Sequence, residues 1–269
     1  MEDLDRVTSS AMHEQIQLAE LAALGIDWDG TVVRQSDRFG LYHAAIARLA
    51  DDDRTYECFC TRREIRDAAQ APQGAILADG AYPGTCRVLT AATRRRLLDE
   101  GRLPAIRLRA GDALVEVDDE VRGRFRGQVD DFVLRRNDGV PAYNLAVVID
   151  DAAQGVGEVV RGDDLLSSTP RQVLLQRLLM LPTPRYRHVP LVLGSDGVRL
   201  AKRHGDVTLE QLAQRSIEPA AVLSLLAASL GLAVAGEQLT AADVVARFDL
   251  AALTREPWIV PVDLQRSQP

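Results

Sequence analysis

Apolar residues recur at helical spacing in two stretches near the start of the chain. The pattern predicts a helix over residues 10–24, ended by Gly25, and a second, alanine-rich helix over residues 40–50. A third, shorter helix is expected around Thr93–Glu100. Both long stretches are typical of helices that pack on a core rather than of cofactor sites. The positions expected to face inward in the first helix are Ile16, Leu18, Leu21 and Leu24.

The region 104–136 changes to alternating or short apolar runs, divided by Gly-Asp and Asn-Asp-Gly turn signals. This pattern predicts an insert that is rich in strands. The expected strands are Ala105–Arg109, Ala113–Val117, Arg122–Gln128 and Phe132–Arg135.

A continuous apolar run follows at Asn144–Ile149 and is closed by two aspartates. Because strands of parallel sheets are buried on both faces, this run predicts a buried parallel strand. Glu158–Arg161 predicts a short strand, followed by a helix from Asp163 to about Met180, and Val189–Leu193 predicts another strand.

From Asp206 onward the pattern is helical. The sequence thus predicts an α/β nucleotide-type core that is interrupted by an insert and followed by a small helical part. The expected C-terminal helices are Leu209–Arg215, Ala220–Leu232 and Ala241–Phe248.

The composition is that of an ordinary soluble protein, with 46% hydrophobic and 26% charged residues among 269. No apolar run reaches the roughly 18 residues that a membrane span requires. The first residues are acidic and do not have the pattern of a signal peptide. We therefore expect a cytoplasmic protein that does not contact membranes, and we expect a monomer.

Charge is distributed unevenly along the chain. The net charge is −7, yet residues 61–136 hold 15 arginines against 12 acidic residues, so the remainder carries −10. A local basic surface on an acidic protein suits a discrete contact with RNA. The alternative is that these arginines form internal ion pairs. The arginines concerned are Arg94–Arg96, Arg107, Arg109, Arg122, Arg124, Arg126, Arg135 and Arg136.

All three cysteines, Cys58, Cys60 and Cys86, lie in one short part of the chain, and Tyr82 precedes the last of them by four residues. An odd number of clustered cysteines argues against a disulfide framework. Thiolates suit zinc, and closed sites with four ligands are the structural type. Tyrosine is an unusual fourth ligand, and reduced cysteines without a metal are the alternative.

Lys202 is the single lysine among 32 basic residues. It lies in the segment Arg199–Arg203, just after a Gly-Ser-Asp-Gly turn. A compact ammonium on a loop is a common way to hold a phosphate that is being transferred, and arginine does not reproduce its shape. The alternative is a surface lysine without a role.

Four segments of the chain occur in this order: Glu2–Arg6; Cys58–Cys60 with Tyr82 and Cys86; Tyr143–Ala146 with Val159–Gly162; and Arg199–Arg203. Together they resemble the class I glutamyl-tRNA synthetases and, more closely, their short paralogues, the glutamyl-Q tRNA(Asp) synthetases. The resemblance covers residues 1 to about 235. Only 67 residues follow Lys202, too few for the anticodon-binding region of a full glutamyl-tRNA synthetase. The Cys-x-Cys and Tyr-x-x-x-Cys motifs also resemble the zinc site of the paralogues.

The resemblance implies a role for each matching residue. Glu2 would meet the α-ammonium of bound L-glutamate, and Tyr143 and Arg161 would be further glutamate contacts. Lys202 would bind ATP and stabilise the phosphates as the adenylate forms. The same resemblance implies one structural Zn²⁺ per chain, and its ligands would be Cys58, Cys60, Tyr82 and Cys86.

The implied activity is that of an aminoacyl-tRNA-synthetase-like ligase. ATP, accompanied by Mg²⁺, would activate glutamate, which would then be transferred to queuosine in the anticodon loop of tRNA(Asp) to form glutamyl-queuosine. Two alternatives remain: a fragment of a glutamyl-tRNA synthetase, or a non-catalytic zinc-containing protein that binds RNA.

The implied fold is a class I, Rossmann-like catalytic core with an inserted zinc-bearing α+β domain of the acceptor-binding type. The two halves of the core would be residues 1–55 and 141–205, the second with the mobile lysine loop. The insert would be residues 56–140, and residues 206–269 would form the helical C-terminal region.

The chain departs from the family at its start and in its lysine loop. The glycine-bearing strand, the HIGH-type ATP-binding turn and the arginine before that turn do not occur. Met1 stands where the family has Val or Ile, so we expect a start codon upstream and an incomplete ATP site, which makes activity of the chain as written doubtful. Arg199 and Ala201 replace the first and third residues of the family's Lys-Leu-Ser-Lys loop.

Structural roles are the alternatives for the three glutamate candidates. Glu2 could belong to the charge cluster of a helix N-terminus. Tyr143 could be a core aromatic residue, and Arg161 could pair with Asp163 or Asp164.

Overall fold

The computed structural model describes residues 1–269 except 6–8, 70–80, 201–207, 235 and 261–269. Its helices are α1 (Ala11–Ala23), α2 (Phe39–Asp51), α3 (Arg62–Ala69), α4 (Ala91–Asp99), α5 (Tyr143–Ala153), α6 (Thr169–Leu178), α7 (Leu209–Gln214), α8 (Pro219–Ser229) and α9 (Ala241–Arg247). Short 3-10 helices are η1 (Gln35–Arg38), η2 (Asp163–Ser168) and η4 (Leu250–Ala252). The strands are β1 (Thr55–Cys58), β2 (Ala105–Leu108), β3 (Leu114–Asp119), β4 (Gly123–Gln128), β5 (Val133–Arg135), β6 (Glu158–Gly162), β7 (Arg185–Val189), β8 (Val192–Leu193) and β9 (Trp258–Ile259).

The described strands form three sheets. The largest has the order β4-β3-β7-β6, in which β3 and β4 are antiparallel while β7 runs parallel to both β3 and β6. The second sheet, β1-β2-β5, is antiparallel, and β8 pairs with β9 in parallel. Parallel strands β3, β7 and β6 therefore end at one edge of the largest sheet.

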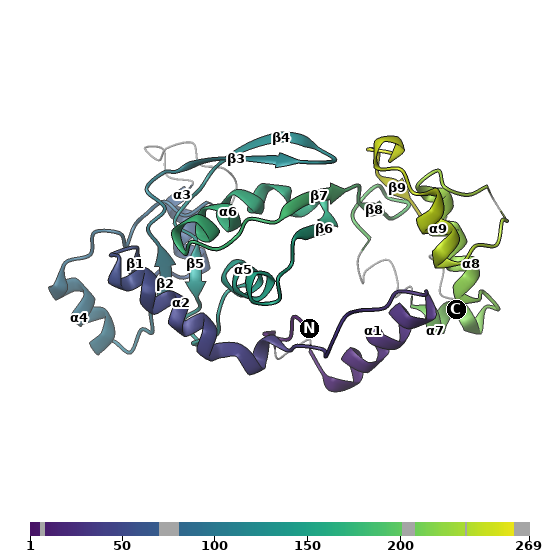
Figure 1. Ribbon diagram of the computed structural model, residues 1–269. Helices are drawn as coiled ribbons and strands as arrows, with labels where there is room; N and C mark the ends of the chain where they lie inside the picture. The colour runs from purple at the N-terminus through teal and green to yellow at the C-terminus, as the bar shows by residue number, and fades with distance from the viewer. Residues whose placement is uncertain (6–8, 70–80, 201–207, 235, 261–269) are drawn as a thin grey trace.

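The main core lies between the first two sheets and helices α2, α5 and α6. Figure 1 shows α6 beneath the β3–β4 ribbon and α5 near the centre of the molecule. Burying one large apolar side chain stabilises the fold by roughly 1.5–3 kcal/mol, so this cluster holds the elements together. Its fully buried members include Tyr42, Leu49, Leu108, Leu134, Leu145 and Leu175.

Helix α6 approaches β4 closely at Gly127. A Cβ atom built on this glycine would lie 2.6 Å from Cγ of Pro170, near the start of α6. Any side chain here would push the helix off the strand, so the packing of α6 on the sheet requires glycine at this position.

Most predicted elements are confirmed, with ends that shift by one to three residues. The helices α1, α2, α4, α7, α8 and α9 occur where the apolar pattern predicts them, and so do strands β2 to β6. The inward face predicted for α1 is wrong, because no residue of this helix is buried and Ile16 and Leu21 are exposed. Strand β3 of the predicted insert pairs with β7, which lies in the second half of the predicted core. The domain boundaries themselves stay a prediction.

The predicted strand at Asn144–Ile149 is wrong, because this run belongs to helix α5. A short apolar run does not distinguish a buried strand from a buried helix. Helix α5 is enclosed by α2, α6 and β5, so most of its faces are buried and no polar stripe marks its period. The aspartates that suggested a strand end lie inside the helix, and Asp150 is itself buried.

Two further predictions differ in detail. The helix predicted from Asp163 begins as the 3-10 helix η2 and becomes α-helical only at Thr169. The strand predicted at Val189–Leu193 is divided into β7 and β8 around Pro190, which has no N–H for a sheet hydrogen bond. Among the described residues, no helix has the length and apolarity needed to cross a membrane.

Candidate functional site

The pairing of strands β6 and β7 brings Arg161 next to His188. These two residues are direct partners in the parallel register, so their side chains lie on the same face of the sheet. Asp119 is the last residue of β3, the strand on the other side of β7. All three residues lie toward the carboxyl ends of parallel strands, where ligands commonly bind in α/β folds.

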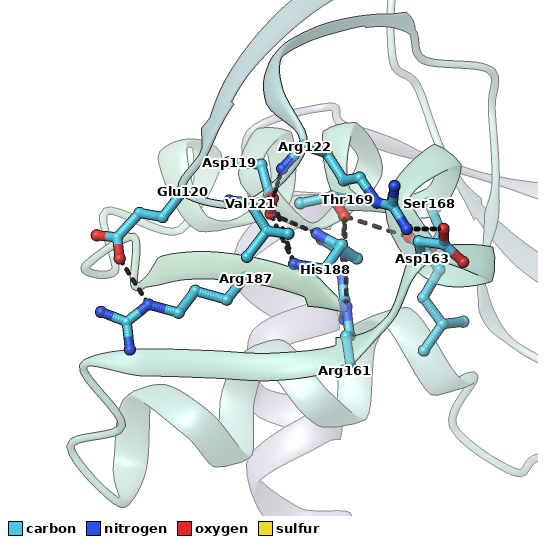
Figure 2. Close-up of polar contacts among 11 residues, drawn as sticks. Asp119, Glu120, Val121, Arg122, Arg161, Asp163, Ser168, Thr169, Arg187 and His188 are labelled. Atoms are coloured by element: carbon cyan, nitrogen blue, oxygen red, sulfur yellow. Dashed lines mark hydrogen bonds and ion pairs between the residues drawn. The ribbon is translucent and has the colours of Figure 1, made fainter. Parts of the chain in front are cut away.

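The Arg161 guanidinium is held by two hydrogen bonds (Figure 2). Its Nε donates to Nε2 of His188 at 3.0 Å, and its Nη2 donates to the hydroxyl of Thr169 at 2.8 Å. Its Cζ also lies 5.3 Å from the centre of the Tyr186 ring. Arg161 is partly buried, so its charge acts in a medium of lower dielectric constant than water.

Asp119 is buried on the other side of His188. Its carboxylate accepts from Nδ1 of His188 at 2.6 Å and from the backbone N–H groups of His188, Val121 and Arg122. Burial alone raises the pKa of Asp119, but these hydrogen bonds outweigh it and lower that pKa below its ordinary value. Burial lowers the pKa of His188, so its ring favours the neutral form.

Tyr143 and Glu2 lie within electrostatic reach of Arg161. Tyr143 is the first residue of α5, and its side chain is 38% exposed. Burial is the largest cause that raises the pKa of Tyr143, and the negative charge of Glu2 is the next largest. The positive charge of Arg161 lowers this pKa. Desolvation raises the pKa of Glu2, although the chain's N-terminal ammonium and Arg161 both lower it.

Helix α5 adds two carboxylates with different environments. Asp150 is buried and accepts from the Tyr42 hydroxyl at 2.7 Å, and it forms an ion pair with Arg38 at 2.9 Å. Asp151 lies within electrostatic reach of Arg161 and Glu2. Burial, its largest cause, raises the pKa of Asp151 to about 6.

This arrangement suits an α-amino acid that carries both charges. A guanidinium offers a planar pair of N–H groups to a carboxylate, and a carboxylate such as Glu2 can receive an ammonium. The structure therefore brings together all three residues that the resemblance assigned to glutamate, namely Glu2, Tyr143 and Arg161. Their role as glutamate contacts stays a prediction.

The structure does not support the proposed ion pair from Arg161 to Asp163 or Asp164. Asp163 pairs with Arg122 at 2.5 Å, and Asp164 pairs with Arg199 at 2.5 Å. Glu2 lies outside the helices, since α1 begins only at Ala11.

The three cysteine sulfurs form a compact group whose atoms all lie within 4.8 Å of one another. The Tyr82 hydroxyl lies 3.4 Å from Sγ of Cys58 and 3.7 Å from Sγ of Cys60, while Cys60 and Cys86 are 3.4 Å apart. Tetrahedral zinc at about 2.3 Å from each sulfur would separate the sulfurs by about 3.8 Å. The donor set and its spacing therefore fit a metal ion with four ligands.

Charge around this cluster also suits a metal. Hydrogen bonding from Cys60, the largest cause, lowers the pKa of Cys58, and Arg107 contributes in the same direction. The Arg107 Cζ lies 3.7 Å from the centre of the Tyr82 ring. Thiolate is the form of cysteine that binds metal, and a nearby cation offsets part of the negative charge of several thiolates.

An open hollow of about 1150 Å³ adjoins the first residues of the chain. It is lined by α1, by the segment around Arg34, and by Thr208 and Glu210 just before and within α7. Arg34 is paired with Glu14 at 2.6 Å, so much of its charge is already compensated. The remaining acidic residues in the wall are Glu2, Asp3, Glu20 and Glu210. The described wall of this hollow therefore carries more acidic groups than basic ones, even when the N-terminal ammonium of Met1 is counted.

Two other predictions have different outcomes. Lys202 lies outside the described residues.

Many of the clustered arginines form internal ion pairs, which is the alternative to an RNA contact. These pairs are Arg94–Glu57, Arg96–Glu100, Arg122–Asp163, Arg126–Glu116 and Arg136–Asp138.

The sequence alone does not mark His188, Asp119, Thr169 or Asp151 as parts of this site. His188 precedes an apolar run, and Asp119 lies among other acidic residues, so neither has a distinctive local pattern. Only the pairing of β3, β7 and β6 brings them to Arg161. One signal was present in the sequence, since the chain has only four histidines.

Residues 1–263 match the family described as tRNA synthetases class I (E and Q), catalytic domain. The glutamyl-Q tRNA(Asp) synthetase of Nocardia farcinica (strain IFM 10152) is 57% identical over 260 residues, which cover 97% of this chain and 81% of that protein. The glutamyl-Q tRNA(Asp) synthetase of Symbiobacterium thermophilum is 43% identical over 274 residues, covering 98% of this chain and 85% of that protein.

A solved structure has the same fold. The crystal structure of a glutamate tRNA ligase from Elizabethkingia meningosepticum CCUG26117, in complex with its amino acid, superposes with a TM-score of 0.79. The match covers 98% of this chain and 60% of that one at 24% identity. The chain therefore has the class I synthetase catalytic fold, with mixed α/β sheets and helices.

Proposed function

Because the chain belongs to the class I E and Q tRNA synthetases, a family of ligases, we propose that it activates glutamate with ATP and transfers it to queuosine in tRNA(Asp). The product would be glutamyl-queuosine. The observation that carries this proposal is that Glu2 and Tyr143 lie within electrostatic reach of Arg161, which stands at the edge of the largest sheet.

The charges at this edge support an amino acid as the first substrate. Arg161 would hold one carboxylate of glutamate through paired hydrogen bonds. Glu2 would receive the α-ammonium, and the Tyr143 hydroxyl would supply a further hydrogen bond. Removing any one partner would leave a charged group desolvated, so glutamate binding would depend on all three.

The proposed reaction has two steps. The α-carboxylate of glutamate attacks the α-phosphate of ATP, pyrophosphate leaves, and glutamyl-adenylate forms. Queuosine then attacks the activated carbonyl, and AMP leaves. Lys202 would stabilise the phosphates in the first step, with Mg²⁺ bound to ATP, and the rate would come mainly from positioning and charge stabilisation.

The cysteine cluster is proposed to hold one structural Zn²⁺. Its ligands would be Cys58, Cys60, Tyr82 and Cys86, whose donor atoms have the spacing described above. When bound, the metal would join β1 to the segment around Tyr82 and so support the proposed insert, residues 56–140. The proposed core would then comprise residues 1–55 and 141–205, followed by the helical region 206–269.

Queuosine in tRNA(Asp) is the proposed acceptor because the Nocardia relative, at 57% identity, is named for that reaction. The second candidate is an ordinary glutamyl-tRNA synthetase, which would charge tRNA(Glu). The third, a non-catalytic RNA-binding protein, would transfer glutamate to neither RNA.

The test is transfer of radiolabelled glutamate, in the presence of ATP and Mg²⁺, to three purified RNAs, by the chain and by a form of it to which the family's HIGH-type segment has been joined. They are tRNA(Asp) that contains queuosine, tRNA(Asp) from a strain that cannot make queuosine, and tRNA(Glu). Protein is kept in excess over RNA so that slow transfer is counted. We expect label on the first RNA alone.

Arg161→Ala is the matched negative control, and it should abolish labelling. Label on tRNA(Glu) would identify an ordinary synthetase. An absence of label on all three RNAs would reject catalysis by this chain.

A further inference from the structure

The strongest feature that the proposed reaction does not use is the buried chain of contacts from Asp119 through His188 to Arg161 (Figure 2). Both His188 and the Asp119 side chain are fully buried, so neither can touch a substrate. Only Arg161, at the end of the chain of contacts, is accessible to solvent. Any effect of the first two residues on the reaction must therefore pass through Arg161.

Asp119 fixes which nitrogen of the His188 ring carries the proton. Its carboxylate already accepts from three backbone N–H groups, and it lies 2.6 Å from Nδ1 of His188. An ionised carboxylate only accepts hydrogen bonds, so Nδ1 must carry the hydrogen. In a neutral imidazole, Nε2 is then left as an acceptor.

Arg161 requires this tautomer. Every polar hydrogen of a guanidinium is a donor, and the group has no acceptor. The 3.0 Å contact between Arg161 Nε and His188 Nε2 is therefore a hydrogen bond only when Nε2 lacks a proton. The hydroxyl of Thr169 lies 3.1 Å from the same Nε2 and accepts from Arg161 Nη2, which fixes the guanidinium at a second point.

Two of the five guanidinium N–H groups are thus used to orient the side chain, and the others remain for a ligand and for Tyr143. We propose that His188 and Asp119 are positioning residues, which hold the Arg161 guanidinium in the orientation that receives a carboxylate of glutamate. This inference rests on the proposed function, in which Arg161 binds glutamate. The two residues contribute to substrate affinity without contacting the substrate.

A pair of substitutions separates positioning from packing. In His188→Asn, the amide can still donate to Asp119 but does not reach Arg161. In His188→Gln, the longer amide places an oxygen near the position of Nε2, where it can accept from Arg161. We expect roughly ten-fold weaker glutamate binding for His188→Asn, because a bond to a charged group is lost. His188→Gln should recover most of that affinity.

The measurement is equilibrium dialysis of radiolabelled glutamate, with ATP binding measured in parallel and expected to be unaffected. Arg187→Gln is the matched control on the same strand, because Arg187 points to Glu120 and Glu158. It should bind glutamate as the unsubstituted chain does. If both His188 variants weaken binding equally, or neither does, the positioning role is wrong. If the unsubstituted chain does not bind glutamate, the proposed function fails as well.

A second measurement needs no variant of a buried residue. Nitrogen NMR of the labelled, unsubstituted protein at neutral pH reports the tautomer of each histidine. We expect His188 to carry its proton on Nδ1, with Nε2 unprotonated. A proton on Nε2, or on both nitrogens, would overturn the inference even if the His188 variants fail to fold.

Discussion

The hydroxyl oxygen of Tyr82 lies 3.4 Å from the sulfur of Cys58, although 24 positions separate the two residues. The same oxygen accepts from the backbone N–H of Cys86 at 2.8 Å. The tyrosine thus points its polar atom into the cysteine cluster. This is the arrangement expected of a fourth metal ligand.

We predict one tightly bound zinc per chain, measured by elemental analysis of protein purified without added metal. Tyr82→Phe should keep the packing of the ring and lose one donor, so a chelator should remove zinc faster from this variant. Tyr56→Phe is the matched control, because Tyr56 packs in the same cluster but its hydroxyl binds Asp131 at 2.7 Å. Zinc that dialyses away without loss of folding would contradict the prediction.

Arg161→Lys should weaken glutamate binding by roughly ten- to a hundred-fold, since a hydrogen bond to a charged group contributes about 1.5–3 kcal/mol. Lysine keeps the charge but cannot bind His188 and Thr169 while presenting a planar pair of donors. Calorimetric titration with glutamate measures the change. Arg187→Lys is the control on the neighbouring strand, and equal affinities for the two variants would show that Arg161 acts only as a charge.

Asp151→Asn should stabilise the protein at pH 8 and have less effect near pH 5. The pKa of Asp151 is raised from 3.8 to about 6, so folding favours its protonated form. The resulting contribution to stability is present below pH 3.8 and is lost as pH rises through 6. The difference of about two between the folded and unfolded pKa values of Asp151 corresponds to at most about 3 kcal/mol of folding free energy. Solvent screening reduces the expected gain in stability to about 1–2 kcal/mol.

Urea unfolding at the two pH values measures this difference. Asp118→Asn is the control, because the Asp118 side chain is 80% exposed. A gain for Asp151→Asn that is the same at both pH values would show that the carboxyl does not titrate as described.

In a form of the protein to which the family's HIGH-type ATP-binding turn has been joined, Lys202→Arg should lower kcat far more than it raises KM for ATP, whereas in the 269-residue chain it should matter little. The ammonium should bind phosphate oxygens most strongly as charge shifts in the transition state, and only contacts of that kind raise the rate. Arginine retains the charge but not the compact shape. Glutamate-dependent ATP–pyrophosphate exchange measures both constants, and unchanged kinetics would remove the role given to the single lysine.

The apolar pattern predicts a helix or strand correctly where one face of that element is buried and the other face meets water. Helix α2 has such a pattern, and the apolar period located it to within a residue. Helix α5 does not, because packing against α2, α6 and β5 buries most of its faces. Asp150 strengthened the wrong interpretation, since its partners Tyr42 and Arg38 are more than 100 positions away and no local pattern reveals them.

The candidate site also has residues that the sequence indicates and residues that only the structure reveals. Glu2, Tyr143 and Arg161 were proposed because short motifs around them resemble a family, and the fold brings them together. His188 and Asp119 lie in strands whose pairing is set by long-range contacts, so their relation to Arg161 could not be read from local sequence. Resemblance proposes the residues that would meet substrate, whereas the residues proposed to orient Arg161 required the structure.

The most direct test of the proposed function is the position of the transferred glutamate. The chain is incubated with ATP, Mg²⁺, glutamate and queuosine-containing tRNA(Asp), and the RNA is digested to nucleosides for mass spectrometry. We predict that queuosine gains the mass of one glutamyl group and that the 3′-terminal adenosine does not. Glutamate on the terminal adenosine, or an unmodified queuosine, would contradict the account.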